Sequence, residues 1–539
     1  MRKILLILII LLAIGTAQAT WYDTNYTYFK PITINHSYVN GTVTNHTLLI
    51  DITDTDLRDK TQADGDDIIF VNYEHTTQLD HQIEKFNSTT GHLIAWIRVS
   101  SITNTSDTTI NMYYNYSGAT NSENPSGVWG TNAAGVWLMN EGTGTWANDS
   151  SSNTNNGSLE NMADPPTATS GWNDSCRIDG GLQFDGANDY VDCGIIGNFK
   201  TVTMWVKLNT HVDYDFYFAH NNFRFYTHTD NGILYLGDSS ANNVISSIDM
   251  DNYAGQWVHI AGVSDGADSA IYFNGINVVS TPDTLEAVVP NTVNIGRWTG
   301  DTHYTNGAID SVRIYNRALS AEEIRYHYNR GGPVAEWNFD EGSGQTAYDE
   351  SFNNNDGTLG ATSAVEASDP TWVEGKYGGA LSFDGGDYVD LGYGKFDYEV
   401  LTVCVWFKAT DAISSGDWRI VQSGSENTNK WMLSLDSAGV TFSNTDASHA
   451  TALASPVAAN KWYHVCGVRS PAESIYLNGV LHTTTYNDSW TFGANTQIGT
   501  AGGSRYFNGS IDDVRIYNYA RTPEQILQDY NAGKGVYFK

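Results

Sequence analysis

Ile511-Asp512-Asp513-Val514-Arg515-Ile516-Tyr517-Asn518 occurs twice in this chain of 539 residues, because residues 309–316 read Ile-Asp-Ser-Val-Arg-Ile-Tyr-Asn. Each copy alternates apolar and polar residues, which is typical of a half-buried strand. A capping box, the start signal of a helix, follows each copy: Ser-x-x-Glu at 320–323 and Thr-Pro-x-Gln at 522–525. Two homologous modules are therefore expected to end at these strands.

The repeat extends far upstream of these strands. A Glu-Gly-x-Gly turn occurs at 141–144 and again at 341–344, which is 200 residues later. The same offset places Asp349 on Asp149 without a gap. Solenoid repeats are only ~20 to 50 residues long, so self-similarity at this period predicts tandem domains.

The order of motifs in the second module is specific. It reads Trp-x-x-x-Glu-Gly-x-Gly at 337–344, Asp-Gly-Thr-Leu at 356–359, Leu-Ser-Phe-Asp-Gly-Gly-Asp-Tyr-Val at 381–389, Trp-Tyr-His-Val at 462–465 and Tyr-Leu-Asn-Gly at 476–479. With the closing strand, this order resembles the laminin-G-like jelly roll of the concanavalin A-like sandwich superfamily, which includes pentraxins and legume lectins. The resemblance implies a fold and leaves function open, since this superfold serves adhesins, sugar-binding modules and glycosidases.

The segment before the repeat is predicted to be a separate β domain. Alternating runs separated by Asn, Gly and Asp turns predict strands from residue 20 to about 130. The motifs at 64–70, 79–83, 95–99 and 113–115 resemble an uncharacterised domain family that often precedes jelly rolls in secreted prokaryotic proteins. We therefore expect an all-β chain with an N-terminal β-sandwich at 20–130 and jelly rolls at 131–332 and 333–539.

The first 19 residues predict export. Met1-Arg2-Lys3 precedes an apolar run, Ile4 to Ile14, and an Ala-x-Ala cleavage pattern ends at Ala19. The apolar run is shorter than the ~20 residues that span a bilayer, and an uncleaved N-terminal anchor is the alternative. We expect no other transmembrane segment and a secreted or cell-surface location. The Asn-x-Ser/Thr triplets, ten of the twelve before residue 175, then become candidate glycosylation sites.

The charge of the chain disfavours one class of partner. There are 28 Lys and Arg against 61 Asp and Glu, which gives a formal net charge of -33. Such a chain repels nucleic acids and anionic membranes. A nucleic-acid partner is therefore not expected.

Four cysteines allow three disulfide connectivities. Cys404 and Cys466 align with Thr203 and Ala261, so one module has cysteine at both positions and the other at neither. That pattern is expected if the two positions face each other, and pentraxins place a disulfide between the corresponding strands. We predict Cys404–Cys466, with Cys176–Cys193 as the second bridge.

Acidic residues recur at matching turns of the two modules. Calcium takes 6 to 8 oxygen ligands, which carboxylates, Asn side chains and backbone carbonyls near the first and last strands of a module would supply. The alternative is that these side chains accept backbone N–H groups in Gly-rich turns. The candidate calcium ligands are Glu141, Asp149, Asn156 and Asp310 in the first module and Glu341, Asp349, Asp356 and Asp512 in the second.

The sequence favours binding over catalysis. The Glu-x-Asp-x-x-Glu and Glu-x-Asp-x-Glu motifs of laminarinase-type relatives are missing. Aromatic side chains in loops suit sugar faces, although packing in a chain this aromatic is the alternative. We expect a non-catalytic protein that binds glycans or extracellular proteins. A secreted glycoside hydrolase or its accessory carbohydrate-binding region, and a structural envelope component, are the alternatives. The candidate ligand-binding residues are Trp298, Tyr304, Trp418 and Tyr506.

Overall fold

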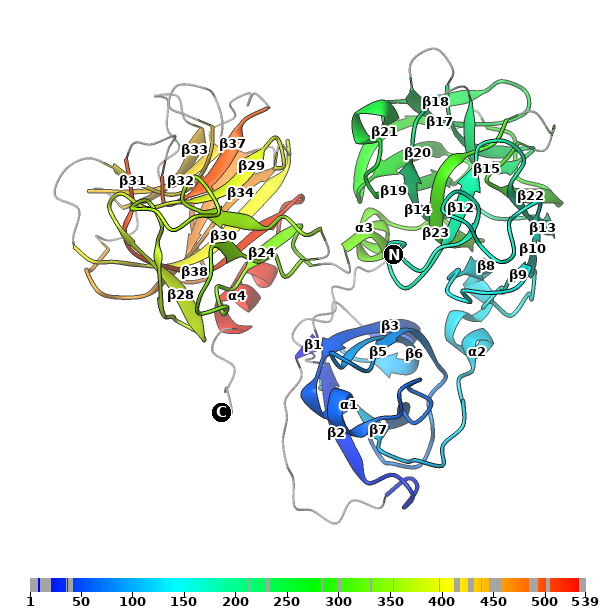
Figure 1. Cartoon of the computed structure of the whole chain (residues 1–539), viewed down its shortest axis with the longest axis horizontal. Helices are drawn as coiled ribbons and strands as arrows, with labels where there is room; N and C mark the ends of the chain where they lie inside the picture. Colours follow the sequence, from blue (N-terminus) through cyan, green and yellow to red (C-terminus); the bar gives the residue numbers. More distant parts are fainter. Residues whose placement is uncertain are drawn as a thin grey trace. The chain divides into compact units, whose positions relative to one another are not determined.

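The architecture was analysed in a computed structural model of the whole chain (Figure 1). The structure describes residues 8–9, 21–34, 36, 42–211, 214–228, 232–282, 285–298, 300, 303–329, 332–351, 353–396, 398–411, 417–424, 431–437, 439–444, 457–470, 472–483, 493–500 and 505–532. Most of the predicted export signal lies outside these residues. The chain forms two compact units, residues 1–331 and 332–539.

The N-terminal domain is a small sandwich of two antiparallel sheets, drawn in blue in Figure 1. Ile32, Leu48, Phe70 and Ile97 belong to the apolar core between the sheets. One sheet has the order β1 (Leu8–Ile9), β2 (Tyr28–Ile34), β7 (Thr108–Tyr114), β4 (Ile69–Asn72), and the other β3 (Val43–Thr53), β6 (His92–Ile102), β5 (His81–Asn87). Short helices are α1 (Thr55–Lys60), α2 (Pro125–Trp129) and η2 (Gly130–Asn132).

The first jelly roll packs two antiparallel sheets face to face. We call the sheet that holds the repeated strand the closing sheet and its partner the opposite sheet. The closing sheet has the order β11 (Gly171–Trp172), β12 (Leu182–Asp185), β23 (Asn306–Tyr315), β14 (Thr201–Leu208), β19 (Val258–Ser264), β20 (Asp268–Phe273), β21 (Ile276–Pro282), and β8 (Ala133–Trp137) pairs with β23. The opposite sheet has the order β18 (Asn243–Asp249), β17 (Ile233–Gly237), β16 (Phe223–Thr227), β15 (Asp215–His220), β22 (Asn291–Ile295), β13 (Tyr190–Ile196), β10 (Gly157–Glu160), β9 (Trp146–Ala147).

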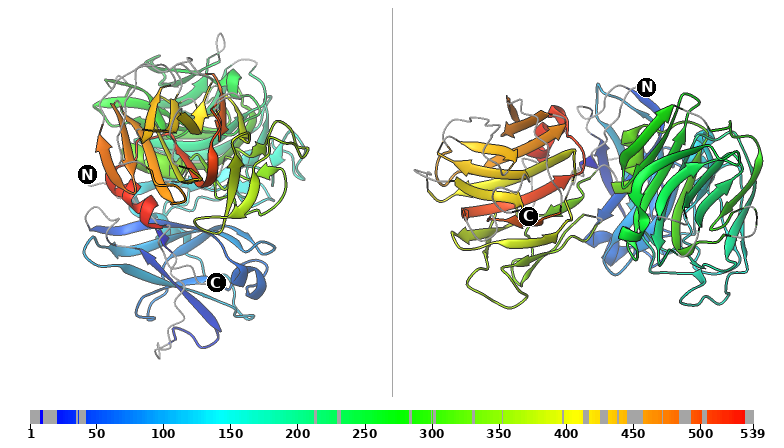
Figure 2. Two further views of the ribbon diagram at one scale, coloured as in Figure 1. Left: turned by 90° about the vertical axis from the view of Figure 1, so that its left-hand side faces the viewer. Right: turned by 90° about the horizontal axis from the view of Figure 1, so that it is seen from above.

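The second jelly roll repeats this plan, and the strands of each jelly roll run in stacked layers (Figure 2). Its closing sheet has the order β27 (Thr371–Glu374), β28 (Gly379–Asp384), β38 (Asn508–Tyr517), β30 (Leu401–Ala409), β34 (Tyr463–Ser470), β35 (Ala472–Leu477), β36 (Val480–Thr483), with β24 (Ala335–Trp337) on β38. Its opposite sheet has the order β25 (Thr346–Ala347), β26 (Gly357–Leu359), β29 (Val389–Tyr393), β37 (Asn495–Ile498), β31 (Asp417–Ser423), β32 (Trp431–Asp436), β33 (Val440–Asn444).

The repeated stretch is the closing strand of each module, β23 and β38. It alternates because its apolar residues, such as Ile309 and Ile511, face the core. The pairing of β23 with β14 and that of β38 with β30 each contain a register shift. At this shift, Ser311 and Asp513 have φ of 52° and 51°. A bulge of this kind re-aims the neighbouring side chains.

A predicted helix follows each closing strand: α3 (Ala321–Asn329) follows β23, and α4 (Pro523–Ala532) follows β38. A separate short helical turn, η3 (Met250–Tyr253), lies between β18 and β19. Both capping boxes are confirmed. Glu323 N–H donates to Ser320 Oγ at 3.3 Å, and Ser320 N–H donates to Glu323 Oε2 at 2.9 Å. Gln525 and Thr522 exchange the same two bonds at 3.3 and 2.8 Å.

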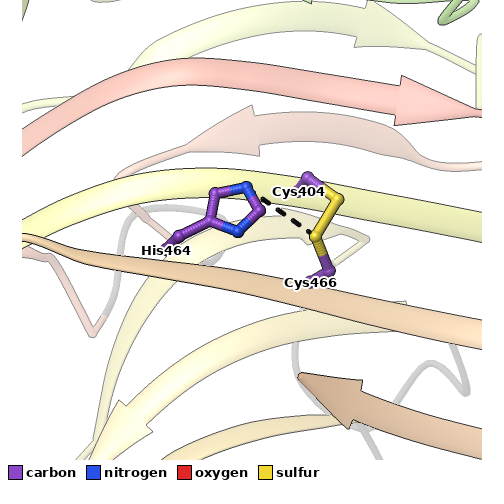
Figure 3. A group of neighbouring side chains, drawn as sticks. All are labelled: Cys404, His464 and Cys466. Atoms are coloured by element: carbon purple, nitrogen blue, oxygen red, sulfur yellow. Dashed lines mark hydrogen bonds between the residues drawn. A yellow bond between two sulfur atoms is a disulfide. The ribbon is translucent and has the colours of Figure 1, made fainter. Parts of the chain in front are cut away.

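The predicted Cys404–Cys466 disulfide is confirmed (Figure 3). The two residues are directly opposed on β30 and β34, with Cα atoms 4.1 Å apart. His464 lies beside the bond, with Nε2 3.9 Å from Cys466 Sγ. Like its counterpart His259, it is buried in the core, and this burial lowers the pKa of both rings to about 3.

The predicted Cys176–Cys193 bridge is wrong, since both thiols are free. Cys193 belongs to β13 of the opposite sheet and is 2 % exposed in the core. Cys176 lies beside Gly181, which leads into β12 of the closing sheet. Cys193 therefore lies in the opposite sheet and Cys176 in the loop beside the closing sheet, and their positions flanking one hairpin in sequence did not bring them together.

None of the helices in the described part of the chain is long and apolar enough to cross a membrane.

Candidate functional site

The acidic turns of the first module are satisfied by backbone N–H groups. Asp149 Oδ1 accepts from Val136 N and Ser151 N, both at 2.8 Å, and its Oδ2 accepts from Asn155 N at 2.8 Å. The side chain of Asn156 accepts from Asp149 N. These bonds tie the first strand, β8, to the turn after β9.

The second module repeats this arrangement bond for bond. Asp349 accepts from Glu336 N, Ser351 N and Asn355 N at 2.6 to 2.9 Å, and Asp356 accepts from Asp349 N at 2.9 Å. The turn-capping alternative thus accounts for most of these oxygens. One atom in each module is different: Oε2 of Glu141 and of Glu341 is buried without a hydrogen-bond partner in the described structure.

Asp310 and Asp512 do not join these turns. Asp310 Oδ2 accepts from Ile178 N at 2.9 Å, and Asp512 Oδ2 accepts from Lys376 N and Tyr377 N at 2.7 and 3.0 Å. Burial raises the pKa of each carboxyl to about 7. They hold the segment before β12 or β28 onto the closing strand.

Calcium binding stays a prediction. The candidate ligands divide between separate places in each module, and most of their oxygens already accept N–H groups. Among the described residues, the one group of three His, Cys, Asp or Glu side chains close enough to share a metal is Cys404, His464 and Cys466. Its sulfurs are bonded to each other, so they supply no thiolate ligand.

An aromatic cluster lies on the outer face of the opposite sheet in the first jelly roll. We call this face, which points away from the core, the outer face. Phe216 and Tyr226 are its buried centre, whereas Tyr214, Tyr235 and Trp298 are partly buried around them. The intervening residues of the same strands, such as Phe225 and Leu236, face the core. The strands are therefore apolar on both sides.

The rings form a row across β17, β16, β15 and the segment after β22. Tyr235 stacks on Tyr226 at 5.4 Å, Tyr226 on Phe216 at 4.8 Å and Phe216 on Trp298 at 5.4 Å between ring centroids. His303 continues the row, nearly parallel to Trp298 at 5.8 Å. His228 also stacks on Tyr235, at 5.2 Å. Because neighbouring rings cover the ring faces within the row, a ligand would contact the exposed ring edges.

Arg224 adds a cation to this row. Its guanidinium carbon lies 4.8 Å from the centroid of Trp298. The residue is half-buried, and its Nε is buried without a hydrogen-bond partner in the described structure. Burial is the main cause of the lowered pKa of this arginine. The outer face thus combines stacked rings with one guanidinium.

A small cavity lies elsewhere in the same unit, between the N-terminal domain and the first jelly roll. Its volume is about 370 Å³, and Gln82, Asn140, Glu141 and Asn148 are among its lining residues. Asn140 and Gln82 already bond across the junction, to Glu84 O and to Ser150 Oγ. The cavity is therefore part of the domain contact.

Comparison with protein families decides the classification. The model of the concanavalin A-like lectin/glucanases superfamily matches residues 185–325 and 383–527, more than half of the chain. The chain belongs to this superfamily. The predicted resemblance is confirmed, and the predicted uncharacterised domain matches a domain of unknown function, DUF2341, over residues 64–149.

Several solved structures are similar to parts of this chain. Domain 4 of AbnA, a GH43 extracellular arabinanase from Geobacillus stearothermophilus, is 20% identical over 37% of this chain and 98% of that chain, with a TM-score of 0.32. A pentraxin from Limulus polyphemus is 19% identical over 31% and 84%, with a TM-score of 0.24. Mouse laminin α1 domains LG4-5 are 14% identical over 60% and 84%, with a TM-score of 0.23. A search of curated protein sequences finds no match.

The two concanavalin A-like modules differ on the outer face. By strand register, Arg419, Ser434 and Thr441 of the second module take the places of Phe216, Tyr226 and Tyr235. Met432 takes the place of Arg224. The aromatic row and its arginine therefore belong to the first module.

Of the four predicted aromatic residues, Trp298 is the one that joins the row. Tyr304 is half-buried, and its backbone forms an isolated antiparallel β-bridge with Arg297, the residue before Trp298. Trp418 packs edge-on against Phe507 at 6.0 Å, and Tyr506 is half-buried beside Phe507. Packing, the alternative considered from the sequence, accounts for Trp418.

Sequence reasoning missed Phe216, Arg224, Tyr226 and Tyr235. A signal for them exists in the superfamily modules themselves. The runs at 215–218 (Asp-Phe-Tyr-Phe) and 223–226 (Phe-Arg-Phe-Tyr) carry large rings at successive positions, so one ring of each run must leave the core. The second module lacks such runs in β31 and β32.

Proposed function

We propose that this chain is an exported, non-catalytic carbohydrate-binding protein, and that its first jelly roll holds glycans on the aromatic outer face. The observation that carries the proposal is the row of Tyr235, Tyr226, Phe216 and Trp298 across four segments of one sheet. A concanavalin A-like lectin/glucanase fold in both modules supports the same class of ligand.

The chemistry of the row suits sugars. Aromatic rings present an apolar surface to the C–H faces of a sugar, and tyrosine hydroxyls exchange hydrogen bonds with its hydroxyl groups. Tyr226 Oη already donates to Asn243 Oδ1 at 2.9 Å, which holds that ring upright in the row. Tyr235 and Trp298 are half-buried, so part of each ring is exposed, and His228 and His303 stack on them at 5.2 and 5.8 Å between ring centroids.

The carboxylates beside the outer face support a non-catalytic role. Glycoside hydrolysis needs two available carboxyl groups on either side of the scissile bond. Asp215 binds His211 Nδ1 at 2.8 Å and Asn306 N at 3.2 Å. Asp238 accepts from Ser240 N, Asn242 N and Glu286 N at 2.9 to 3.0 Å. Both side chains are occupied in holding loops.

Export rests on two features. The N-terminal sequence has the pattern of a secretory signal. The Cys404–Cys466 disulfide suits an oxidising compartment. Glycans on a cell surface or in the extracellular matrix are then accessible ligands.

A glycan panel tests the proposal with the full chain and two variants. Trp298→Ala removes a half-buried ring of the row, and Tyr393→Ala removes an aromatic ring that is 73 % exposed on the second jelly roll. We expect the wild type and Tyr393→Ala to bind the same glycans and Trp298→Ala to bind them about tenfold or more weakly, since an aromatic contact contributes ~1 kcal/mol or more. Thermal melting checks that Trp298→Ala is folded.

Two outcomes contradict the proposal. Absence of binding to every glycan by the wild type removes it, and turnover of a polysaccharide by the wild type replaces it with the hydrolase alternative. Equal binding by all three proteins would keep carbohydrate binding and remove the outer face of the first jelly roll as its site.

A further inference from the structure

The outer face of the first jelly roll contains a second row of residues beside the aromatic one. Strand register sets Gly237, Arg224, Ala219 and Asn294 next to one another on β17, β16, β15 and β22. Gly237 and Ala219 on either side of Arg224 are small. The side chain of Asn243 fills the space above Gly237, so Arg224 lies between Asn243 on one side and Ala219 on the other.

Two groups in this row lack the partners that buried polar atoms normally have. Arg224 makes a cation–π contact with Trp298, and no ion pair or side-chain hydrogen bond of Arg224 occurs in the described residues. Asn294 is 1 % exposed, and its Oδ1 has no hydrogen-bond partner in the same described part. Neighbouring strands are ~4.8 Å apart, so these two side chains start about 10 Å from each other.

Among the described residues no carboxylate forms an ion pair with Arg224, although the chain contains 61 acidic residues. Asp238 is the carboxylate that acts on it electrostatically, but that side chain accepts backbone N–H groups of its own loop. Arginine binds carboxylates through two parallel N–H donors, and such charge-assisted bonds are stronger than neutral ones. A guanidinium that has no carboxylate partner in the described part of the chain, and that lies beside an aromatic row, is suited to an anionic sugar.

We propose that the first jelly roll selects saccharides that carry a carboxylate, with Arg224 binding the carboxylate and the aromatic row contacting the sugar ring. This inference rests on the proposed carbohydrate-binding function of the same face. Uronic acids and sialic acids share the required chemistry. Met432 occupies the Arg224 position in the second jelly roll, so that module lacks this selectivity.

Matched sugars with and without the charge test the inference on the full chain. Oligogalacturonate is compared with its methyl ester, and sialyllactose with lactose. We expect the wild type to bind at least one carboxylated member about ten to a hundred times more tightly than its neutral partner, because hydrogen bonds to charged groups contribute ~1.5–3 kcal/mol. The pair that responds identifies the source of the carboxylate.

Arg224→Gln is expected to abolish this preference and Arg224→Lys to restore part of it. The control is Arg58→Gln, which removes the same charge from an exposed site in the N-terminal domain and is expected to change nothing. Equal binding of acidic and neutral members by the wild type, unchanged in Arg224→Gln, overturns the inference while the proposed function stands. If no sugar binds, both are overturned.

Discussion

Glu84 of the N-terminal domain and Arg313 of the first jelly roll form an ion pair of 3.1 Å, and both side chains are 2 % exposed. Ser311 Oγ and Trp96 Nε1 complete the bonds to the Glu84 carboxylate, at 3.2 and 2.6 Å. The guanidinium carbon of Arg313 lies 5.2 Å from the ring centroid of Trp96. A fully desolvated ion pair thus joins the domain of unknown function to the jelly roll that follows it.

The second jelly roll shows why this pair exists. Arg515, the counterpart of Arg313, binds carboxylates of its own module: Glu336 at 2.8 Å, Asp513 at 2.9 Å and Asp529 at 3.8 Å. In the first jelly roll these three positions are Val136, Ser311 and His327. The first module has no carboxylate at these three positions, and Glu84 pairs with its arginine instead. The N-terminal domain therefore supplies the carboxylate that the buried arginine of the first jelly roll needs.

Glu84→Gln is expected to destabilise the first unit by about 3–5 kcal/mol, because it leaves the guanidinium of Arg313 buried without a carboxylate. Urea unfolding of the full chain measures the effect in the transition of residues 1–331. Glu322→Gln is the matched control, since Glu322 is paired with Arg325 at 3.9 Å and is 30 % exposed. The control is expected to change stability by less than ~1 kcal/mol. A small effect of Glu84→Gln would mean that the two domains are not coupled through this pair.

The repeat explains what the sequence could predict. Two copies of the Ile511–Asn518 strand established the tandem jelly rolls, and comparing the copies placed Cys404 opposite Cys466. Cys176 and Cys193 have no counterparts in the other module, so a comparison of the two copies could not show whether these two residues face each other. The predicted bridge between them was wrong. The repeat was informative only where both copies could be compared.

The Glu84–Arg313 ion pair and the aromatic row were less predictable than the fold, because both depend on contacts between distant parts of the sequence. Glu84 and Arg313 are 229 residues apart and belong to different domains, so no local pattern links them. The loss of carboxylates around Arg313 was visible in the sequence, but its meaning required the strand pairing of β8 with β23. The same holds for the aromatic row. Aromatic residues at successive positions of β16 indicate that some of these rings point away from the core. They do not indicate that Tyr226 lies opposite Tyr235 on the neighbouring strand.

The disulfide is expected to stabilise the second jelly roll alone. The double variant Cys404→Thr with Cys466→Ala installs the residues that the first module has at these positions, Thr203 and Ala261. The two cysteines are 62 residues apart in sequence. Loss of the cross-link is expected to cost about 4 kcal/mol in the chain-entropy model.

Calorimetry of the full chain should show a lower melting temperature for residues 332–539 and an unchanged transition for residues 1–331. Cys193→Ala is the contrasting variant, because Cys193 is a free, buried thiol of the first unit. It should shift the first transition and leave the second in place. If the double variant shifted neither transition, the disulfide would have no stabilising role.

The buried Oε2 atoms of Glu141 and Glu341 give a test of the calcium prediction. If calcium binds at these turns, it is expected to raise the melting temperatures of both units, because a ligand that binds only the folded state stabilises it. Glu341→Gln should remove the shift from the second transition and leave that of the first. Chelator-treated and calcium-loaded proteins with identical melting curves would establish these residues as turn caps only.

Asp512 is expected to make the second jelly roll less stable as the pH rises. Burial raises its folded pKa to about 7, whereas the ordinary value is 3.8, so the folded state binds the proton more tightly than the unfolded state does. The favourable contribution is complete below pH 3.8 and is lost as the pH rises through about 7. Asp512→Asn keeps an oxygen to accept from Lys376 N and Tyr377 N and removes the titration. The variant should therefore gain stability over the wild type between pH 4 and 8, by about 1.4 kcal/mol for each unit of pKa shift.

The difference between the unfolding free energies of the two proteins, measured at several pH values, isolates this group from the other carboxyls. Asp390→Asn is a control on the same module, because Asp390 is a partly exposed residue whose Oδ1 accepts from Gly392 N. This variant shows how much stability changes when a partly exposed carboxyl of the same module is replaced by an amide. Because Asp513 and Asp340 add to the electrostatic penalty on Asp512, replacing Asp340 with Asn should lower the midpoint of the wild-type loss. A pH-independent difference for Asp512→Asn would show that the carboxylate is charged in the folded state throughout this range, with its two N–H donors outweighing burial.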